Sequence, residues 1–293
     1  MIVIDDGSTD ATCNIVRSYQ PRFNLTLVEQ DHTGNWTIGT NRGMEMATGE
    51  YMCWLHQDDR WESHRLATFR DLVAKFPDAG LFLDSSWFVC PKGERIRRWT
   101  CPLPSNRMLQ PDYVVPRFLV QCFVASCCPV FSTKLAREIG ILDESLWFLA
   151  DWDFWLRLAS LTRSVNSSMG PSCEYRIHSA AQTVFRSQST EDLQRQYHSV
   201  LQKYDNPKFA RVASFSAKTN LDLFQGFHHG AQISTVFRLL TRFVALWPTE
   251  QIMYLRYSRM FERLAARRRF MRYRSTGQET DAISLTDESE ALA

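Results

Sequence analysis

The chain has 293 residues, of which 44% are hydrophobic and 23% are charged. These are values of a globular protein, and the length fits one large domain or one domain with an extension. The net charge of +2 provides no general attraction to nucleic acid, and no nucleic-acid-binding motif is present, so we expect no such partner. No segment reaches the roughly 20 apolar residues of a membrane helix, and Met1 leads into a strand rather than a signal peptide.

The cysteines predict a reducing compartment. There are eight of them, at positions 13, 53, 90, 101, 122, 127, 128 and 173. None forms a Cys-x-x-Cys pair or a cysteine–histidine cluster with the spacing of a zinc site. We therefore expect free thiols and a cytoplasmic protein.

Strands and helices are predicted to alternate over the first 76 residues. Ile2–Ile4 is apolar enough to be a buried strand, Gly7 permits a tight turn, and Ser8 or Thr9 can begin a helix. That helix ends near Tyr19. The later elements are strands at Leu25–Glu29 and Tyr51–Leu55 and helices at Asn35–Ala47 and Trp61–Phe76. This alternation predicts an α/β fold with a mostly parallel sheet and crossover helices.

The pattern changes after residue 80. The expected elements are a hairpin of Ser85–Cys90 and Glu94–Trp99, proline-rich loops near Pro102, Pro104 and Pro111, a strand at Val124–Phe131, and helices at Thr133–Ile139 and Asp151–Leu161. In the last of these helices, the helical spacing of Trp152 and Trp155 favours core packing over a sugar-binding face. From Ser187 onward only helices are predicted.

The carboxy-terminal part combines an apolar stripe with basic residues. The stripe consists of Ile233, Val236, Phe237, Leu240, Val244 and Trp247. A set of arginines runs from Arg256 to Arg274, and the final Gln278–Ala293 segment is polar and predicted to be disordered. The arginines are either a solvated helix face or a contact with an anionic membrane surface.

Paired carboxylates follow two of the predicted strands. Asp5 and Asp6 end the first, and Asp58 and Asp59 come directly after the third. The carboxyl ends of strands in an open α/β sheet are where ligands bind, and paired acids suit Mg²⁺ or Mn²⁺ held against phosphates. Each pair also has a structural interpretation, as a turn with a helix cap or as a solvated loop. Asp151 is likewise either an N-cap or a functional acid.

Five sequence pieces in order resemble the motifs of family 2 glycosyltransferases with the GT-A fold. They are Asp5–Asp10, Gly39–Gly43 with Ala47–Tyr51, Leu55–Asp59, Gly140–Glu144 with Ala150–Leu158, and Tyr175–His178. His56, Ala150 and Thr40 depart from the family's usual residues. The chain also starts one strand later than the family pattern, without the first strand and its Pro-x-Tyr-Asn-like loop.

The resemblance implies three regions. A GT-A-like, Rossmann-like domain is expected over residues 1–185, a helical extension over 186–275, and an acidic tail over 276–293. The implied function is a metal-dependent, inverting transfer of a sugar from a nucleotide-sugar to a hydroxyl of a glycan or a lipid-linked acceptor. Contact of the basic helix with the inner face of the membrane would suit a lipid-linked acceptor.

The resemblance also assigns roles to single residues. Asp5, Asp6, Asn41 and Asp58 are expected to bind the nucleotide-sugar. Asp59 and His178 are expected to hold Mn²⁺ or Mg²⁺, although a histidine of this kind is more often simply packed or hydrogen-bonded.

Asp151 is expected to be the general base that accepts the proton of the acceptor hydroxyl. A single displacement assisted by one base inverts the anomeric carbon.

Two other interpretations remain open at this point. The chain is alternatively a catalytically inactive relic or an interaction module of the same fold. A nucleotidyltransferase would also use paired carboxylates, but its glycine-rich phosphate loop is not found. A dinucleotide dehydrogenase is disfavoured because no Gly-x-Gly-x-x-Gly follows a strand.

Overall fold

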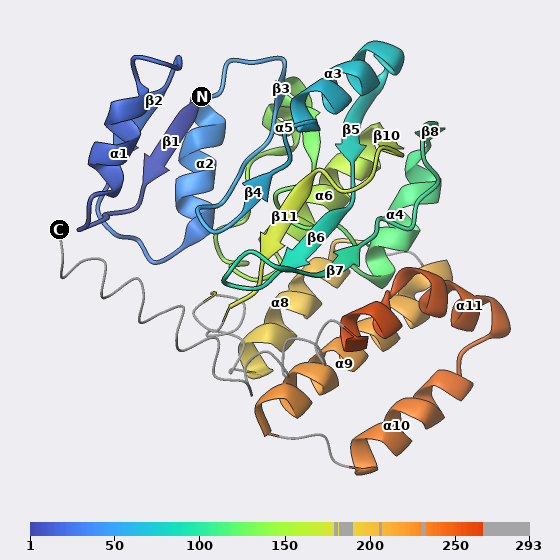
Figure 1. Ribbon diagram of the computed structural model, residues 1–293. Helices are drawn as coiled ribbons and strands as arrows, with labels where there is room; N and C mark the ends of the chain where they lie inside the picture. Colours follow the sequence, from blue (N-terminus) through green and yellow to red (C-terminus); the bar gives the residue numbers. More distant parts are fainter. Residues whose placement is uncertain (179–180, 182–189, 205–206, 230–232, 266–293) are drawn as a thin grey trace.

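The computed structural model describes residues 1–178, 181, 190–204, 207–229 and 233–265 (Figure 1). The amino-terminal elements are β1 (Ile2–Asp5), α1 (Thr12–Tyr19), β2 (Thr26–Glu29), α2 (Trp36–Met46), β3 (Tyr51–Met52), β4 (Arg60–Trp61) and α3 (Arg65–Lys75). The central elements are β5 (Ala79–Leu83), β6 (Ser86–Val89), β7 (Arg95–Trp99), β8 (Met108–Leu109), α4 (Pro111–Val120), β9 (Val130–Ser132), α5 (Thr133–Ile139), α6 (Ala150–Leu161), β10 (Arg163–Asn166) and β11 (Cys173–Arg176). The remaining helices are α8 (Thr190–Gln202), α9 (Pro207–His229), α10 (Ile233–Val244) and α11 (Pro248–Tyr257).

The strands form three sheets. A five-stranded sheet has the order β3-β9-β5-β10-β8, a four-stranded sheet has the order β4-β11-β6-β7, and β1 pairs with β2. In the five-stranded sheet β3, β5 and β10 run one way while β9 and β8 run the other. The predicted α/β class is confirmed. The sheets are mixed rather than mostly parallel, because β9 enters antiparallel between β3 and β5 instead of following a crossover helix.

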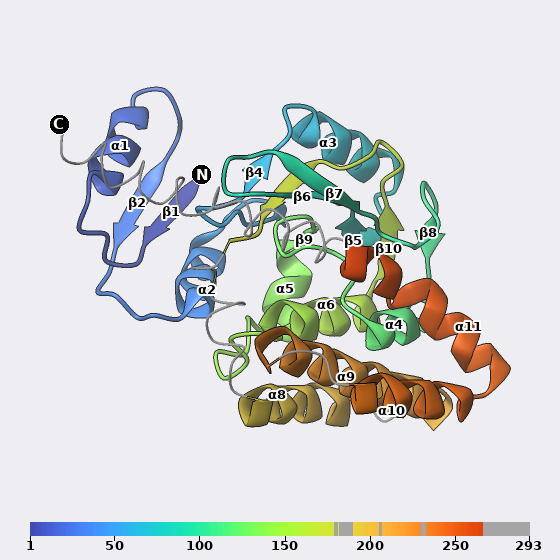
Figure 2. The ribbon, with the colours of Figure 1, turned by 60° about the horizontal axis from the view of Figure 1, so that its bottom comes forward.

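The amino-terminal strand pair differs from the prediction. Ile2–Ile4 was expected to be buried, but these residues are only half-buried. In the part of the chain that the structure describes, β1 pairs with β2 alone. Figure 2 shows α1, β1 and β2 at the margin of the molecule, with α2 beside them. A strand with one unpaired edge keeps part of its apolar surface accessible, which explains the difference.

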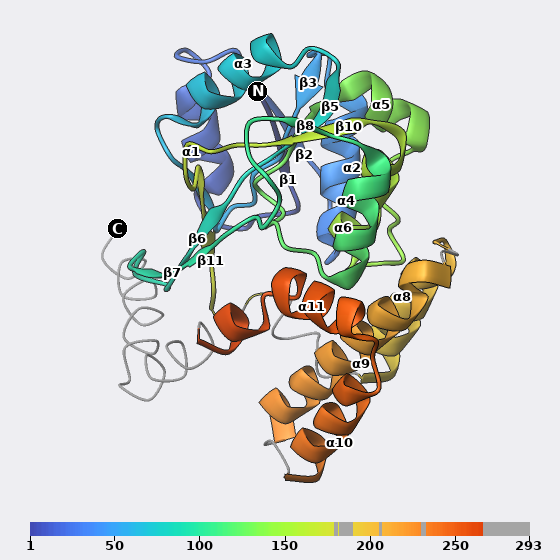
Figure 3. The same cartoon turned by 90° about the vertical axis from the view of Figure 1, so that its right-hand side faces the viewer.

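One hydrophobic core joins the sheet to the carboxy-terminal helices. Trp155 is fully buried in α6, and its ring stacks on that of Trp54 with centroids 4.9 Å apart. Trp152 is also buried, so the prediction of core positions for both tryptophans is confirmed. Phe215 of α9 and Tyr254 of α11 belong to the same core. The helices α9 and α11 pack on α4, α8 contacts α6 through Tyr197 and Trp152, and α10 packs on the outer side of α9, as Figure 3 shows from the side.

Several other predictions can be compared with the observed elements. The helix at Thr133–Ile139 has the predicted bounds, and the hairpin turns at Gly93, whose φ of 85° suits glycine. Pro111 begins α4 where a loop was expected, because proline is tolerated in the first turn of a helix. Residues 266–293, with the last arginines and the predicted tail, lie outside the described residues. Within the described part, no helix has both the length and the apolar character to cross a membrane.

Candidate active site

Asp58 and His178 form the most accessible pair of predicted site residues. Oδ2 of Asp58 lies 3.1 Å from Nε2 of His178, and the two side chains are 30% and 25% exposed. Burial acts to raise the pKa of Asp58, but the hydrogen bond from His178, a backbone hydrogen bond and the charges of His56 and His178 together outweigh it and lower that pKa overall. A carboxylate oxygen and an imidazole nitrogen thus face each other at the surface, which is a donor set that divalent cations accept.

Asp59 is held beneath this pair. It is 6% exposed, and its Oδ1 accepts a hydrogen bond of 3.0 Å from the backbone N–H of Arg176. The Arg176 guanidinium donates to the carbonyl oxygens of Asp58, Cys90 and Pro91, which fastens the turn to the β6–β7 hairpin. Burial raises the pKa of Asp59 to about 7. This carboxyl is therefore enclosed rather than presented to a ligand from solvent.

Asp5 and Asp6 shape the turn after β1. Asp5 accepts hydrogen bonds from the backbone N–H and the hydroxyl of Ser8, and these bonds lower its pKa. Gly7 has a φ of 81°, and a side chain there would collide with the backbone of His32.

Asp6 uses its carboxylate to hold the facing loop. It accepts hydrogen bonds from Gln30, Thr33 and Gly34, which together overcome desolvation and lower its pKa. Its side chain is still 34% exposed. Both carboxylates thus accept hydrogen bonds within the protein, and the Asp6 side chain remains partly exposed to solvent.

Asn41 connects α2 to the loop before α6. It is 2% exposed, its Oδ1 accepts from the backbone N–H of Leu142, and its Nδ2 donates to Leu142 O and to Glu144. The amide is thereby fully used within the protein. Asn41 therefore holds α2 next to the loop at Leu142 and Glu144, and its side chain is not exposed to solvent.

Asp151 lines a cavity between the sheets and the carboxy-terminal helices. The cavity has a volume of about 290 Å³ and is rich in aromatic side chains. Besides Asp151, its lining includes Phe88, Trp99, Phe148, Tyr175, Tyr197, Asn220 and Arg263. Burial raises the pKa of Asp151 to about 6, and its Oδ1 accepts the backbone N–H of Trp152 at 2.7 Å. A carboxylate that is ionised above pH 6 in an apolar pocket suits proton abstraction.

The family model of Glycosyl transferase family 2 matches residues 1–140, a stretch that contains Asp5, Asp6, Asn41, Asp58 and Asp59. Residues 1–140 therefore belong to glycosyl transferase family 2. Asp151 and His178 lie beyond the matched stretch of this glycosyl transferase domain, so their positions rest on the geometry described above.

Curated relatives of the glycosyl transferase domain share about a quarter of its residues. An uncharacterized glycosyltransferase of Rickettsia prowazekii (strain Madrid E) is 23% identical over 184 residues, or 62% of this chain and 56% of the relative. A PGL/p-HBAD biosynthesis glycosyltransferase of Mycobacterium bovis is 25% identical over 162 residues, or 55% of this chain and 58% of that protein. The matched stretch thus spans little more than half the length of these relatives.

A solved structure supports the GT-A fold. TarS 1-349 of S. aureus superimposes with a TM-score of 0.56 at 16% identity, covering 94% of this chain and 82% of that fragment. That protein has also been solved in complex with UDP-GlcNAc. At this level of identity the likeness establishes the fold, and the predicted GT-A-like class is confirmed.

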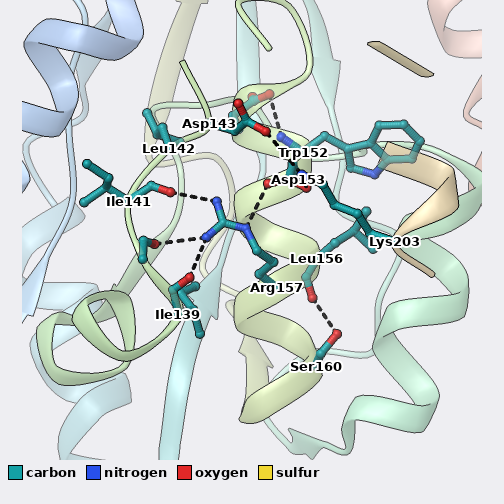
Figure 4. A network of polar contacts seen from close by, with 12 residues as sticks. Ile139, Ile141, Leu142, Asp143, Trp152, Asp153, Leu156, Arg157, Ser160 and Lys203 are labelled. Carbon is teal, nitrogen blue, oxygen red and sulfur yellow. Dashed lines mark hydrogen bonds and ion pairs between the residues drawn. The ribbon is translucent and has the colours of Figure 1, made fainter. Parts of the chain in front are cut away.

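A polar network holds α6, and with it Asp151, in place. Figure 4 shows Arg157 donating to the carbonyl oxygens of Ile139, Gly140 and Ile141 and to Asp153. Asp153 is fully buried and also accepts from Lys203, which directly follows α8, at 2.9 Å. Removing one partner of such a buried ion pair strongly destabilises the fold, because it leaves the other charge buried and uncompensated. The network ties the end of α5, the helix α6 and the helical layer together around the glycosyl transferase domain.

Apart from Asn41, the predicted site residues fall into three groups. Asp58, Asp59 and His178 come together through β11 and its continuation. Asp151 lies in the cavity, to which β11 contributes Tyr175. Asp5 and Asp6 lie at the end of β1, and no hydrogen bond or ion pair among the described residues joins them to the other groups.

The sequence did not predict the aromatic residues that line the cavity. It also did not predict that Arg176 links the Asp58–Asp59 turn to the β6–β7 hairpin. Tyr175 and Arg176 belong to a motif that was recognised, but its pattern did not indicate their contacts. Phe88, Trp99 and Arg263 come from distant segments, and no local signal connects them with Asp151. Three cysteines that the fold brings together were also missed.

Proposed function

We propose that the chain transfers a sugar from a nucleotide-sugar to a hydroxyl group, with inversion and with the help of Mn²⁺ or Mg²⁺. The observation that carries the proposal is the position of β11. Its Tyr175 lines the cavity of Asp151, and two residues beyond its end His178 meets Asp58. A donor side and an acceptor side are thus built around one strand. The catalytic body would span residues 1–185, with the helical extension at 186–275.

On the donor side, Asp58 and His178 would hold the cation. Their facing atoms and partial exposure fit such a group, whereas Asp59 is enclosed and bound to Arg176. Asp58 would therefore hold the cation in place of Asp59, for which this role was expected. Asp59 would position the turn that carries Asp58. When bound, the cation supplies Lewis-acid stabilisation of the leaving diphosphate.

The nucleoside part would be bound near the turn after β1. Asp6 retains 34% exposure and accepting oxygens that suit a ribose hydroxyl or a base N–H. Asp5 keeps this turn in shape through Ser8. Asn41 would act at a distance, by fixing the loop at residues 142–144.

On the acceptor side, Asp151 would accept the proton of the attacking hydroxyl. A pKa of about 6 leaves it ionised at neutral pH and still basic enough to abstract a proton. Aromatic side chains such as Trp99 and Tyr175 can pack against the apolar face of a sugar ring. One base and one displacement give inversion.

Calorimetry and a donor screen test this proposal. UDP and GDP would be titrated into the protein with Mn²⁺ or with EDTA, and a panel of UDP- and GDP-sugars would then be assayed for release of the nucleoside diphosphate. We expect one nucleotide to bind much more tightly with the cation present. If neither nucleotide binds under either condition, the protein is an inactive relic or an interaction module.

We further propose that α10 contacts an anionic membrane from the cytoplasmic side, where a lipid-linked or glycan acceptor would be presented. Phe237, Leu240 and Val244 of α10 and the following Trp247 are 57–73% exposed. An exposed apolar face of this size on a helix is typical of an interaction surface. The arginines at 266–274, which would add attraction to anionic lipid, lie outside the described residues.

Sedimentation with lipid vesicles tests whether the exposed apolar face of α10 binds a membrane or is an ordinary apolar surface. Leu240→Ser is expected to weaken binding to phosphatidylglycerol vesicles roughly tenfold, since burying a leucine is worth about 1.5–3 kcal/mol. Ile15→Ser is a matched control, because Ile15 and Leu240 are both 57% exposed. Equal loss in both variants, or no binding by the unaltered protein, would refute the membrane contact.

A further inference from the structure

Three cysteines that are scattered along the chain meet in the interior. Cys127 and Cys128 lie in the loop before β9, and Cys173 begins β11. Each is 0% exposed, and their sulfur atoms all lie within 4.8 Å of one another. Among the described residues, this is the one group of three or more potential ligands at such distances. We name these residues the thiol cluster.

A buried arginine borders the thiol cluster. Arg65 is 1% exposed, and its guanidinium lies 3.1 Å from Sγ of Cys173 and 2.9 Å from the carbonyl oxygen of Cys128. It also donates to the hydroxyl of Ser172. No carboxylate among the described residues forms an ion pair with it. A buried cation requires nearby negative charge, and thiolate ligands would supply it.

A buried carboxyl with one unpartnered oxygen lies near Cys127. Oδ2 of Asp59 is buried and has no hydrogen-bond partner among the described residues. The Cys127 thiol is near enough to this carboxyl to stabilise its anion. Buried polar atoms are normally hydrogen-bonded, so the polar groups next to the thiol cluster are incompletely satisfied.

We propose that Cys127, Cys128 and Cys173 bind one Zn²⁺ ion through their three sulfur atoms. Zinc–sulfur bonds of about 2.3 Å place tetrahedral sulfurs about 3.8 Å apart, so the thiol cluster needs only a small contraction. The ion replaces the protons of the bound thiols, and Arg65 offsets part of the negative charge. Such a buried site is structural. It would fasten the loop before β9 to β11.

Cobalt substitution tests the site without reference to sugar transfer. The full-length protein would be reduced, stripped with a chelator and titrated with Co²⁺, followed by Zn²⁺. We expect one equivalent of Co²⁺ to produce the near-ultraviolet thiolate-to-cobalt charge-transfer band, and Zn²⁺ to abolish it. Zn²⁺ should also raise the midpoint of thermal unfolding, because it binds the folded state.

Matched variants decide whether the thiol cluster is responsible. Cys128→Ser and Cys173→Ser should lose most of the cobalt band, with folding checked by circular dichroism. Cys101→Ser should keep it, since Cys101 is a buried thiol outside the cluster. If Cys173→Ser does not fold, Cys127→Ser takes its place. An intact band in the cluster variants, no band in the folded wild type, or a disulfide found there instead of metal would overturn the proposal.

Discussion

Replacing Asp151 with Asn is expected to lower the rate of sugar transfer by about 10²–10⁴-fold, the usual contribution of a general base. The carboxylate of Asp151 lines the cavity proposed to bind the acceptor, and the amide of Asn cannot accept the proton. In the unaltered protein, transfer should fall as the pH drops below about 6, because burial raises the pKa of Asp151 to about 6. Steady-state rates from pH 5 to 8 check both statements.

The same variant should be more stable than the wild type. The folded-state pKa of Asp151, about 6, lies above its ordinary value of 3.8. The folded state therefore holds the proton more tightly, and stability is lost as the pH rises through the folded pKa. Above that pH, ionisation costs up to about 3 kcal/mol, at 1.36 kcal/mol per pKa unit. Asn carries no charge and still accepts the N–H of Trp152, so its urea midpoint at pH 8 should increase.

Asp153→Asn is the matched comparison and should have the opposite effect. Asp153 is fully buried between Arg157 and Lys203, so its ionised form is stabilised by its partners. Breaking such a pair typically costs about 3–5 kcal/mol. If Asp151→Asn were as destabilising as Asp153→Asn, or if it kept full activity, Asp151 would be a structural residue instead of the base.

Loss of the carboxylate–imidazole pair should have the second large effect. We expect Asp58→Asn and His178→Ala each to reduce transfer by about 10²–10³-fold, as for loss of one group that stabilises developing charge. Their affinity for a nucleoside diphosphate should no longer respond to Mn²⁺. Calorimetry with and without Mn²⁺ measures this response directly.

Asp59→Asn distinguishes the two neighbouring acids. Its Oδ1 can still accept the N–H of Arg176, and the enclosed side chain does not face the donor side. The variant should therefore keep most of the Mn²⁺ response that Asp58→Asn loses. A Mn²⁺ response that vanishes in Asp59→Asn and persists in Asp58→Asn would return the cation-holding role to Asp59.

Local patterns predicted the elements whose signals are local. The hairpin around Pro91–Gly93 and the helix at Thr133–Ile139 have turn and capping residues of their own, and both were found. By contrast, β10 and β11 are four-residue strands of mixed polarity, Arg163–Asn166 and Cys173–Arg176, without a clear alternation. Their strand form comes from their neighbours in the sheets, which a single segment does not reveal.

The candidate site also combines features with local sequence signals and features that depend on distant residues. The sequence indicated which residue types end the strands, and hence the acids themselves. It did not distinguish Asp58 from Asp59, because their difference in exposure depends on Arg176, more than a hundred residues away. The thiol cluster was missed for the same reason, since β11 brings Cys173 to Cys127 and Cys128 only in three dimensions.

One short strand thus has consequences for how substitutions combine. Cys173 belongs to the thiol cluster, Tyr175 to the acceptor cavity and Arg176 to the Asp59 turn. Successive side chains of a strand point to opposite faces, so any shift of β11 displaces all of these contacts at once. Double-mutant cycles across it should be non-additive, so a substitution of Tyr175 is expected also to alter the proposed cation response of Asp58 and His178.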